Sequence, residues 1–183
     1  MDGHPDAAAL PLLRQDAPEE RLAALFDAHH ERLYRLARRM APSIDDALDL
    51  VQETFLRTAR APAAVPNGHS REEAWLVRVL VNLQRDAWRK STVRQRHASS
   101  LKDLAPEAAD PEATLIARQA VWRALEWLAP RRRAVIVMHE LEALSVPEIA
   151  ALLGISAITV RWHLSLGRRT LTRLLTYQSG GRS

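Results

Sequence analysis

Apolar residues recur at every third or fourth position along most of the chain, the spacing that places them on one face of an α-helix. Prolines and loop-forming residues separate these periodic segments. The pattern predicts amphipathic helices at about residues 22–40, 44–58, 71–91, 115–128 and 131–142. No segment reads convincingly as a half-buried strand, so we expect an all-α fold.

The periodicity stops between residues 92 and 112, where two prolines and several acidic residues occur. This composition is typical of a linker between folded units. We therefore predict two small helical domains joined by a flexible linker. The predicted parts are a mobile lead-in at 1–17, a helical domain at 18–95, the linker at 96–112, a second domain at 113–178 and a disordered tail at 179–183.

The second domain carries the most specific pattern. Ser145 followed three positions later by Glu148 is typical of a capping box, in which the two residues satisfy each other's backbone amides at a helix start. Gly154 suits the left-handed conformation that ends a short helix, and Ser156 can cap the next one. Two helices joined by such a turn form a helix-turn-helix, which we predict here. A plain helical hairpin with a solvated basic face is the alternative.

The charge of the chain is carried almost entirely by arginine. There are 26 Lys and Arg against 22 Asp and Glu, a net charge of +4, and only Lys90 and Lys102 are lysines. Between Arg161 and Arg173 the sequence has four arginines and no acid. Arginine contacts phosphates and reads guanine through two hydrogen bonds. The second helix of the helix-turn-helix is therefore predicted to lie in the major groove of DNA.

Several classes of protein are excluded by what the sequence lacks. Without cysteine there is no disulfide framework, Cys-based zinc site, iron–sulfur cluster or Cys nucleophile. The sequence has no His-Glu-x-x-His motif, phosphate-binding glycine loop or Gly-x-Ser-x-Gly elbow, so we expect no metal, no cofactor and no enzymatic activity. No apolar run reaches the ~20 residues of a membrane span, and the N-terminus does not resemble a secretory signal, which favours a cytoplasmic location.

Four segments in series resemble those of one protein family. They are ALDLVQETFLRTAR at 47–60, AWLVRVLVNLQRDAWRK at 74–90, ALEWLAPRRRAVIVMHELEALS at 124–145 and LSVPEIAALLGISAITVRWHLSLGRRTL at 144–171. In this order they resemble the clamp-binding and promoter-melting helices of region 2, the lead into region 4, and region 4 of bacterial sigma factors of the extracytoplasmic-function class. The resemblance covers about residues 20–175.

This resemblance implies a dissociable, non-catalytic subunit of RNA polymerase that directs promoter recognition and strand opening. The implied partners are the clamp of the largest polymerase subunit, the flap region, promoter DNA as duplex and as single strand, and an anti-sigma factor. Two departures from the family pattern stand out. Leu48 lies where the family usually has an acid, and Gly167 lies inside the predicted recognition helix.

Carried over position by position, the resemblance implies three groups of site residues. The face that binds the polymerase clamp is expected at Asp46, Asp49, Gln52 and Glu53. Contacts to the −10 element are expected from Asn67, His69, Arg78, Asn82, Arg85 and Arg89. Contacts to the −35 element are expected from Ser156, Thr159, Arg161, Trp162, His163, Arg168 and Arg169.

Two other functions stay open at this point. A LuxR-type helix-turn-helix regulator shares the pattern EIA, LGIS and TV within residues 148–160. It would bind duplex DNA without polymerase and would leave residues 20–90 unexplained. A nucleic-acid-modifying enzyme with a helical N-terminal domain would need a catalytic cluster, and we find none in the sequence.

Overall fold

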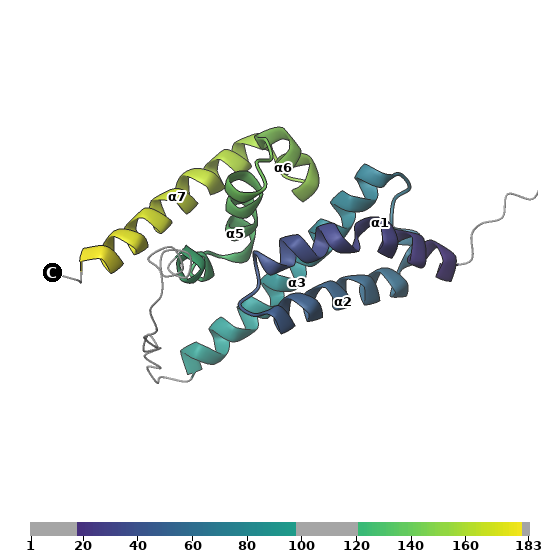
Figure 1. Cartoon of the computed structure of the whole chain (residues 1–183), viewed down its shortest axis with the longest axis horizontal. Helices are drawn as coiled ribbons and strands as arrows, with labels where there is room; N and C mark the ends of the chain where they lie inside the picture. The colour runs from purple at the N-terminus through teal and green to yellow at the C-terminus, as the bar shows by residue number, and fades with distance from the viewer. Residues whose placement is uncertain (1–17, 98–120, 181–183) are drawn as a thin grey trace, which may run out of the picture.

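The computed structural model describes residues 18–97 and 121–180, of which residues 91–97 and 177–180 are described by their backbone alone (Figure 1). All regular structure in these two ranges is helical, which confirms the predicted all-α fold. A short helical stretch at 121–126 precedes the second group of helices. The elements are α1 (Pro18–Arg38), α2 (Ile44–Arg60), η1 (Pro62–Ala64), α3 (His69–His97), α5 (Pro130–Ile136), η2 (Val137–Leu141), α6 (Val146–Leu153) and α7 (Ala157–Gly180).

Local chemistry explains most helix boundaries. The hydroxyl oxygen of Ser43 accepts a hydrogen bond from the backbone N–H of Asp46 at 3.0 Å and so caps the N-terminus of α2. Gly68 has a φ of +103°, which a residue with a side chain rarely adopts, and α3 begins directly after it. Helix α3 continues past the predicted end to His97, because no glycine or proline lies between residues 91 and 97.

The predicted helix at 131–142 is divided into two parts. Its first part is the α-helix α5, and its second part is the π-helical turn η2. The backbone N–H of Glu142 donates to the carbonyl of Val137 at 3.2 Å, five residues earlier, which is the π-helical spacing. The chain then leaves the helix at Ala143, which has a positive φ of 54°.

The first half of the molecule is a bundle of α1, α2 and α3. Helix α1 packs against α2, and α3 contacts both. The stripes predicted from the sequence face inward, as the buried side chains of Leu33 and Leu36 on α1, Val51 on α2, and Leu76 and Leu80 on α3 show. Burial of such large apolar side chains is the main source of stability for a bundle of this size.

The second half consists of α5, η2, α6 and α7. Helices α6 and α7 form an angle of 107° across a break of three residues, which lies within the usual range of a helix-turn-helix. Val160 and Leu164 of α7 and Ile149 and Leu153 of α6 are buried together with residues of α5. These features confirm the helix-turn-helix geometry predicted from residues 145–174.

The two halves share one hydrophobic core. Helix α3 contacts both α5 and α6, and Leu76 and Leu80 belong to the same buried cluster as Met138 and Ile149 (Figure 1). The backbone carbonyl of Met40, in the turn between α1 and α2, accepts hydrogen bonds from the side chains of Gln84 and Arg133. The relative position of the halves does not follow from the sequence pattern and is a finding of the structure.

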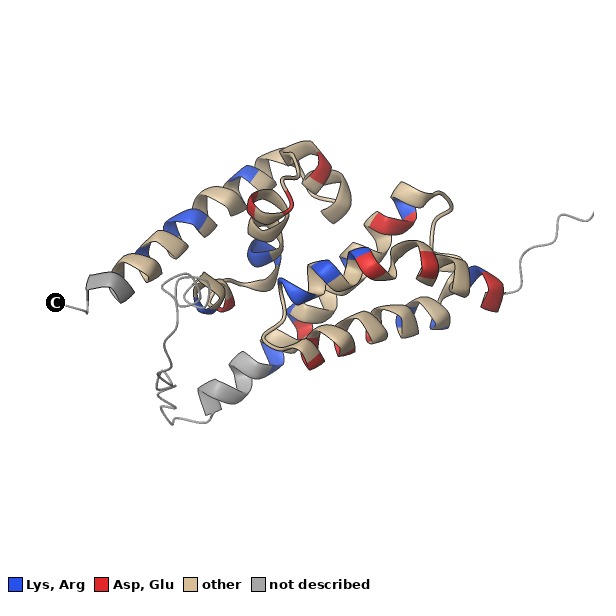
Figure 2. Ribbon diagram, viewed as in Figure 1, with Lys and Arg blue, Asp and Glu red and all other residues tan. Residues whose placement is uncertain are grey.

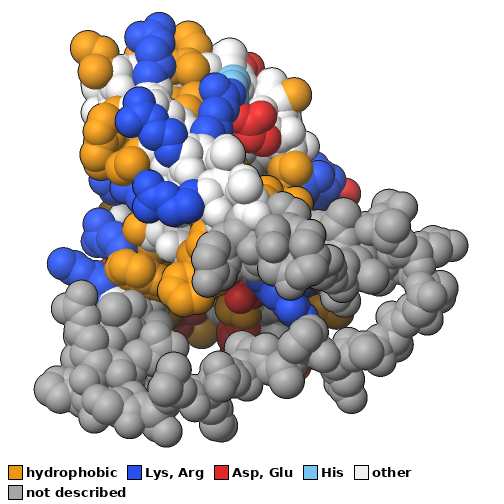
Figure 3. Space-filling model, turned by 90° about the vertical axis from the view of Figure 1, so that its left-hand side faces the viewer, with side chains coloured by type: hydrophobic (Ala, Val, Ile, Leu, Met, Phe, Trp, Pro, Cys, Tyr) orange, Lys and Arg blue, Asp and Glu red, His pale blue; other side chains and the backbone are white. Residues whose placement is uncertain are grey.

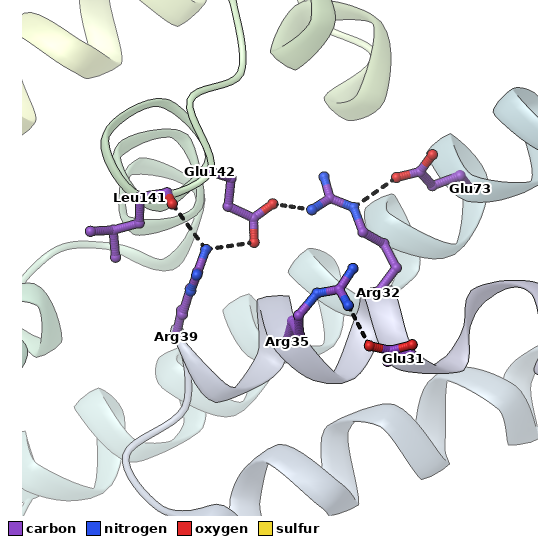
Figure 4. Close-up of polar contacts among 7 residues, drawn as sticks. All are labelled: Glu31, Arg32, Arg35, Arg39, Glu73, Leu141 and Glu142. Atoms are coloured by element: carbon purple, nitrogen blue, oxygen red, sulfur yellow. Dashed lines mark hydrogen bonds and ion pairs between the residues drawn. The ribbon is translucent and has the colours of Figure 1, made fainter.

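Charged side chains reinforce the contact between the halves. The carboxylate of Glu142, which follows η2, binds Arg32 of α1 and Arg39, the residue directly after α1 (Figure 4). Arg32 also donates to Glu73 of α3 at 3.0 Å. The side chain of Glu142 is only 4% exposed, so this carboxylate needs its two arginine partners.

Parts of the predicted organisation lie outside the described residues. These are the lead-in at 1–17, the linker from residue 98 onward and the last three residues. In the part of the chain that the structure describes, no single helix is long and apolar enough to span a membrane, although α6 and α7 pass that test by length and composition when taken together as a bent pair.

Candidate nucleic-acid interface

Helix α7 has a continuous outer face that no other helix within residues 18–97 and 121–180 covers. Ile158, Trp162, Ser165 and Arg169 follow one another at steps of four, three and four residues, and Arg161 adjoins Trp162; all five are exposed. The opposite side of the helix packs on α5 and α6 through its buried apolar residues. No acidic residue occurs in α7, and basic and hydrophobic side chains are interleaved on this side of the molecule (Figures 2 and 3).

Three caps fix the helix ends within the helix-turn-helix. The Ser145 hydroxyl oxygen accepts from the Glu148 N–H, and the Glu148 carboxylate accepts from the Ser145 N–H at 2.7 Å, which completes the predicted capping box. The Ser145 hydroxyl also donates to the Glu148 carboxylate at 2.6 Å, and this hydrogen bond, together with the one from the Ser145 N–H, lowers the pKa of the Glu148 carboxyl group. Gly154 has φ 63° and ψ 42°, the left-handed conformation expected at the turn. Ser156 accepts from the Thr159 N–H at 3.1 Å and caps α7.

Gly167 allows α7 to approach α5 closely. A Cβ atom at this position would lie 2.7 Å from Cγ1 and 2.8 Å from Cδ1 of Ile136 on α5. Distances below 3.0 Å require the neighbouring atoms to move. The glycine that departs from the family pattern is therefore a packing requirement, and its cost of about 1 kcal/mol relative to alanine in a helix is offset by the close contact.

Five of the residues predicted for the −35 element are exposed. They are Ser156, Arg161, Trp162, Arg168 and Arg169. Arg168 is partly engaged, because its guanidinium lies 2.7 Å from the carboxylate of Glu140. The guanidinium of Arg132 lies over the Trp162 ring, 5.6 Å from its centroid.

The other two residues of this group lie toward the interior. Thr159 is half-buried, and its hydroxyl forms a hydrogen bond of 2.8 Å with the Ser156 hydroxyl. His163 is half-buried beside α5, where burial, Arg132 and Arg131 together lower the pKa of its imidazole. The ring therefore favours the neutral form and adds no cation to the outer face. These two residues are therefore less accessible than the other five residues of this group.

A shallow hollow borders the outer face of α7. It has a volume of about 460 Å³ and is lined by His139, Val146, Arg161, Leu164, Ser165, Arg168 and Arg169. His139 is held in place by a 2.9 Å contact between its Nδ1 and the carbonyl oxygen of Leu144. Three arginines and a serine hydroxyl around one hollow provide donors for an anionic group such as a phosphate.

Ile158 shares the outer face but was not among the residues selected from the sequence. It is 76% exposed in the first turn of α7, and Trp162 is 56% exposed one turn later. Its position could have been found from helical spacing alone, because Arg161, Trp162 and Ser165 follow it by three, four and seven residues.

Helix α3 carries the second basic stripe. Arg78, Asn82, Arg85 and Arg89 follow at steps of four, three and four residues, so they share one side of the helix. Arg89 is exposed and the other three are half-buried. A Cβ atom built on Gly154, at the helix-turn-helix corner, would lie 3.1 Å from Nη1 of Arg78, so the second half of the molecule covers this end of the stripe.

The loop before α3 is fastened to α1. Arg21 donates to the carbonyl oxygen of Val65 at 2.8 Å, and the N–H of Gly68 donates to the Glu72 carboxylate at 3.2 Å. The predicted residues Asn67 and His69 are both exposed here. The His69 ring stacks on the ring of His29, with centroids 4.5 Å apart, and His29 is buried within α1. The loop is thus held in a defined conformation.

The third group of predicted residues lies on α2. Asp46, Asp49 and Gln52 are exposed, and Glu53 is half-buried between Arg57 at 3.3 Å and Arg60 at 3.8 Å. Exposed apolar side chains accompany the acids, namely Ile44, Leu48 and Leu56. An exposed face that mixes large apolar and acidic side chains is typical of a protein-binding surface. Leu48, a departure from the family pattern, belongs to its apolar part.

The sequence matches two models of one family. The model described as Sigma-70 region 2 matches residues 25–94, and the model described as Sigma-70, region 4 matches residues 118–171. The first covers α1 to α3, and the second covers the helix-turn-helix. Because the first half of the chain is thereby accounted for, the alternative of a LuxR-type regulator is not favoured.

Curated relatives are named for the same family. The chain is 32% identical to the ECF RNA polymerase sigma factor SigM of Mycobacterium tuberculosis, over 86% of this chain and 78% of that protein. It is 33% identical to SigL of the same species, over 87% of this chain and 90% of that protein. With SigE of Mycolicibacterium smegmatis the identity is 36% over 85% of this chain, which spans 62% of that longer relative.

Two solved structures share the arrangement of helices. The sigma factor RpoE of Bartonella quintana, solved with the anti-sigma factor NepR, matches with a TM-score of 0.57 at 23% identity, over 86% of this chain and 96% of that one, a similarity of fold. CnrH, solved with the cytosolic domain of CnrY, matches with a TM-score of 0.57 at 26% identity, over 87% and 90%. With relatives above 30% identity covered over most of their length and matches to both sigma regions, this chain belongs to the family of ECF RNA polymerase sigma factors.

Proposed function

We propose that this sigma factor binds core RNA polymerase through α2, directs it to promoters through α7 and α3, and performs no catalysis of its own. The outer face of α7 contacts the −35 element as duplex DNA. The stripe on α3 and the loop before it contact the −10 element, whose strands separate during initiation. The observation that carries the proposal is the acid-free outer face of α7, presented by a complete helix-turn-helix in a chain that also has the basic stripe of α3.

Binding of the −10 element needs two kinds of contact. A strand that has left the duplex is held by cations along its backbone, and a flipped base needs a pocket with hydrogen-bonding edges. Arg78, Arg85 and Arg89 supply cations at one side of α3, and Asn82 supplies an amide among them. The loop that holds Asn67 and His69 is braced by α1, which pre-organises it for a base.

The acidic and apolar face of α2 fits a basic, partly apolar partner. Asp49 and Gln52 offer acceptors, while Ile44 and Leu48 offer apolar surface that is buried on binding. We assign this face to core polymerase. An anti-sigma factor that covers α2 or α7 would inhibit the protein by competition.

The test is reconstitution of the full-length chain with bacterial core RNA polymerase, followed by run-off transcription on pooled genomic promoters. We expect co-purification with the core enzyme and discrete new start sites. The double variant Arg161→Ala, Arg169→Ala should weaken binding to the −35 element and reduce the slope of log affinity against log salt by about 2, without affecting core binding. The double variant Asp49→Ala, Glu53→Ala should weaken core binding instead.

A matched control is Arg123→Ala, which removes an exposed arginine that lies on neither α7 nor α3. It should leave both activities unchanged. If both double variants lost both activities while the control did not, the assignment of separate surfaces would be wrong. Duplex binding without any affinity for the core enzyme would contradict the function itself.

A further inference from the structure

We propose that Ile158 and Trp162 read thymine methyl groups in the major groove of the −35 element. The proposal rests on the proposed function, because it requires α7 to lie in that groove. It adds the chemical class of base that this chain selects and a residue, Ile158, that the sequence did not single out.

Both side chains are exposed on α7. Ile158 is 76% exposed and Trp162 is 56% exposed, although both side chains are large and apolar. Single exposed apolar residues are common on protein surfaces and need no explanation. Here, however, two of them stand one turn apart on the face that carries Arg161 and Arg169. This face has the charge that DNA requires, and α7 contains no acid that would repel a phosphate.

Both residues lie near the N-terminus of α7. In a helix-turn-helix, the N-terminal residues of the second helix contact base edges, and the flanking residues contact the backbone. Ile158 is the second residue of α7, and Trp162 follows in the next turn. Ser165 and Arg169 continue the same line toward the C-terminus. The apolar pair therefore lies where bases are read, with arginines placed for phosphates on either side.

The major groove of DNA offers few apolar groups. The C5 methyl group of thymine is the apolar group that a base pair offers in the major groove, where the other bases present hydrogen-bond donors and acceptors. An isoleucine pressed against a polar edge would displace its water and leave that edge without a partner. Ile158 thus favours a thymine methyl over cytosine, which has only a hydrogen atom at C5 and presents its polar amino group beside it.

Trp162 is held in a fixed orientation. The guanidinium of Arg132 lies over its ring at 5.6 Å, and the His163 ring meets it edge-on with centroids 4.9 Å apart. A large side chain that is already oriented loses little conformational entropy on binding. The indole therefore presents a rigid apolar surface next to Ile158.

The experiment uses the holoenzyme formed from the full-length chain and core polymerase. The −35 element found by transcription of pooled promoters is synthesised with each thymine, on either strand, replaced in turn by deoxyuridine. This exchange removes the methyl group and retains the hydrogen-bonding edge. We expect one or two of these replacements to weaken binding about fourfold each, the value for one buried methyl-sized group.

The same probes are then measured with Ile158→Ala and with Trp162→Ala. We expect each variant to bind the thymine promoter more weakly and to lose its sensitivity to at least one deoxyuridine, since the partner of that methyl group is gone. Val121→Ala, which shortens an exposed apolar side chain outside α7, serves as the matched control and should retain the full sensitivity.

Three results would overturn the proposal. A −35 element whose deoxyuridine forms all bind as well as the parent, while Arg161→Ala still weakens binding, would leave the proposed function intact and remove the methyl contact. A −35 element made only of G·C pairs would do the same. If Ile158→Ala weakened holoenzyme assembly and not promoter binding, the apolar pair would be a protein contact. Absence of any core binding would instead refute the proposed function.

Discussion

Helices α7 and α3 both present basic stripes, but they differ in how much of each stripe is accessible. Within the described part of the chain no other helix covers the outer face of α7, and its arginines at 161, 168 and 169 are exposed. On α3, Arg78, Asn82 and Arg85 are half-buried, and the helix-turn-helix corner lies against Arg78. One half of the molecule thus covers part of the other half's candidate DNA-binding surface.

The difference teaches how the chain distributes its contacts. Helix α7 buries one side only, whereas α3 lies between the two halves and contacts α1, α2, α5 and α6. Full access to the α3 stripe requires the second half to move away, while access to α7 requires no movement. We therefore expect variants that weaken the contact between the halves to change the accessibility of the α3 stripe alone. Variants at the contact between α7 and α5 should change α7 alone.

The largest expected effect concerns the packing of α7 against α5. In Gly167→Ala the added methyl group would meet Ile136 at 2.7 Å, so α5 and α7 have to move apart. Overpacking of this kind costs about 1–3 kcal/mol, from which alanine's helix preference of about 1 kcal/mol is subtracted. We expect a net loss of about 0–2 kcal/mol in the free energy of unfolding, measured by urea denaturation.

The double variant Gly167→Ala, Ile136→Ala tests the mechanism. Because the second change removes the clashing atoms, the double variant should lose less unfolding free energy than the sum of the losses in the two single variants. Ser165→Ala, on the exposed side of the same helix, should change stability by less than about 0.5 kcal/mol. A gain in stability from Gly167→Ala would show that helix preference outweighs the close contact and that the contact yields easily.

Sequence patterns captured the elements whose causes are local. The capping box at Ser145 and Glu148, the left-handed Gly154 and the N-cap Ser43 were all predictable, because each depends on residues within four positions. The partial burial of Thr159 and His163 also has a local cause. Both side chains lie on the flank of α7 that turns toward its buried side, beside Val160 and Gly167.

Sequence patterns could not predict the contact between the two halves. Arg133 donates to the carbonyl of Met40, which is 93 residues away along the chain, and nothing near either residue indicates the pair. The same holds for Glu142 and Arg32, which are 110 residues apart. A buried arginine that satisfies backbone carbonyls is indistinguishable in sequence from an exposed one, and Arg133 stands in a run of three arginines.

A smaller effect is expected where the second half of the molecule covers the basic stripe of α3. Glu142→Gln keeps the shape of the side chain and removes the charge that binds Arg32 and Arg39 (Figure 4). Both arginines are partly exposed, so we expect a modest loss of about 1 kcal/mol from the contact between the halves. If α3 binds a single strand only when uncovered, affinity for a −10 oligonucleotide should rise up to about fivefold, while duplex binding by α7 stays unchanged.

The matched control is Glu31→Gln, which removes the carboxylate 2.6 Å from Arg35 on the exposed side of α1. That ion pair does not join the halves, so neither affinity should change. Equal affinities for the oligonucleotide in Glu142→Gln and in the unaltered chain would indicate that the α3 stripe is already accessible, and the contrast with α7 would then be one of burial without consequence.

The smallest effect expected is on pH dependence, and it separates the two flanks of α7. Burial, Arg132 and Arg131 lower the pKa of His163 in the folded chain, whereas in the unfolded chain it returns to about 6.5. The unfolded state therefore binds the proton first, so this contribution to stability is complete above about pH 6.5 and declines as the pH falls below it. His163→Gln should flatten that part of the profile of unfolding free energy against pH. Because burial is the largest cause, high salt should remove only a minor share of the slope. Binding of duplex DNA depends on arginines of the outer face, so as the pH falls from 8 through the titration of His163, below about pH 6.5, it should be the same with and without the imidazole. A DNA affinity that followed the titration of His163 would mean that this flank of α7 also contacts the duplex.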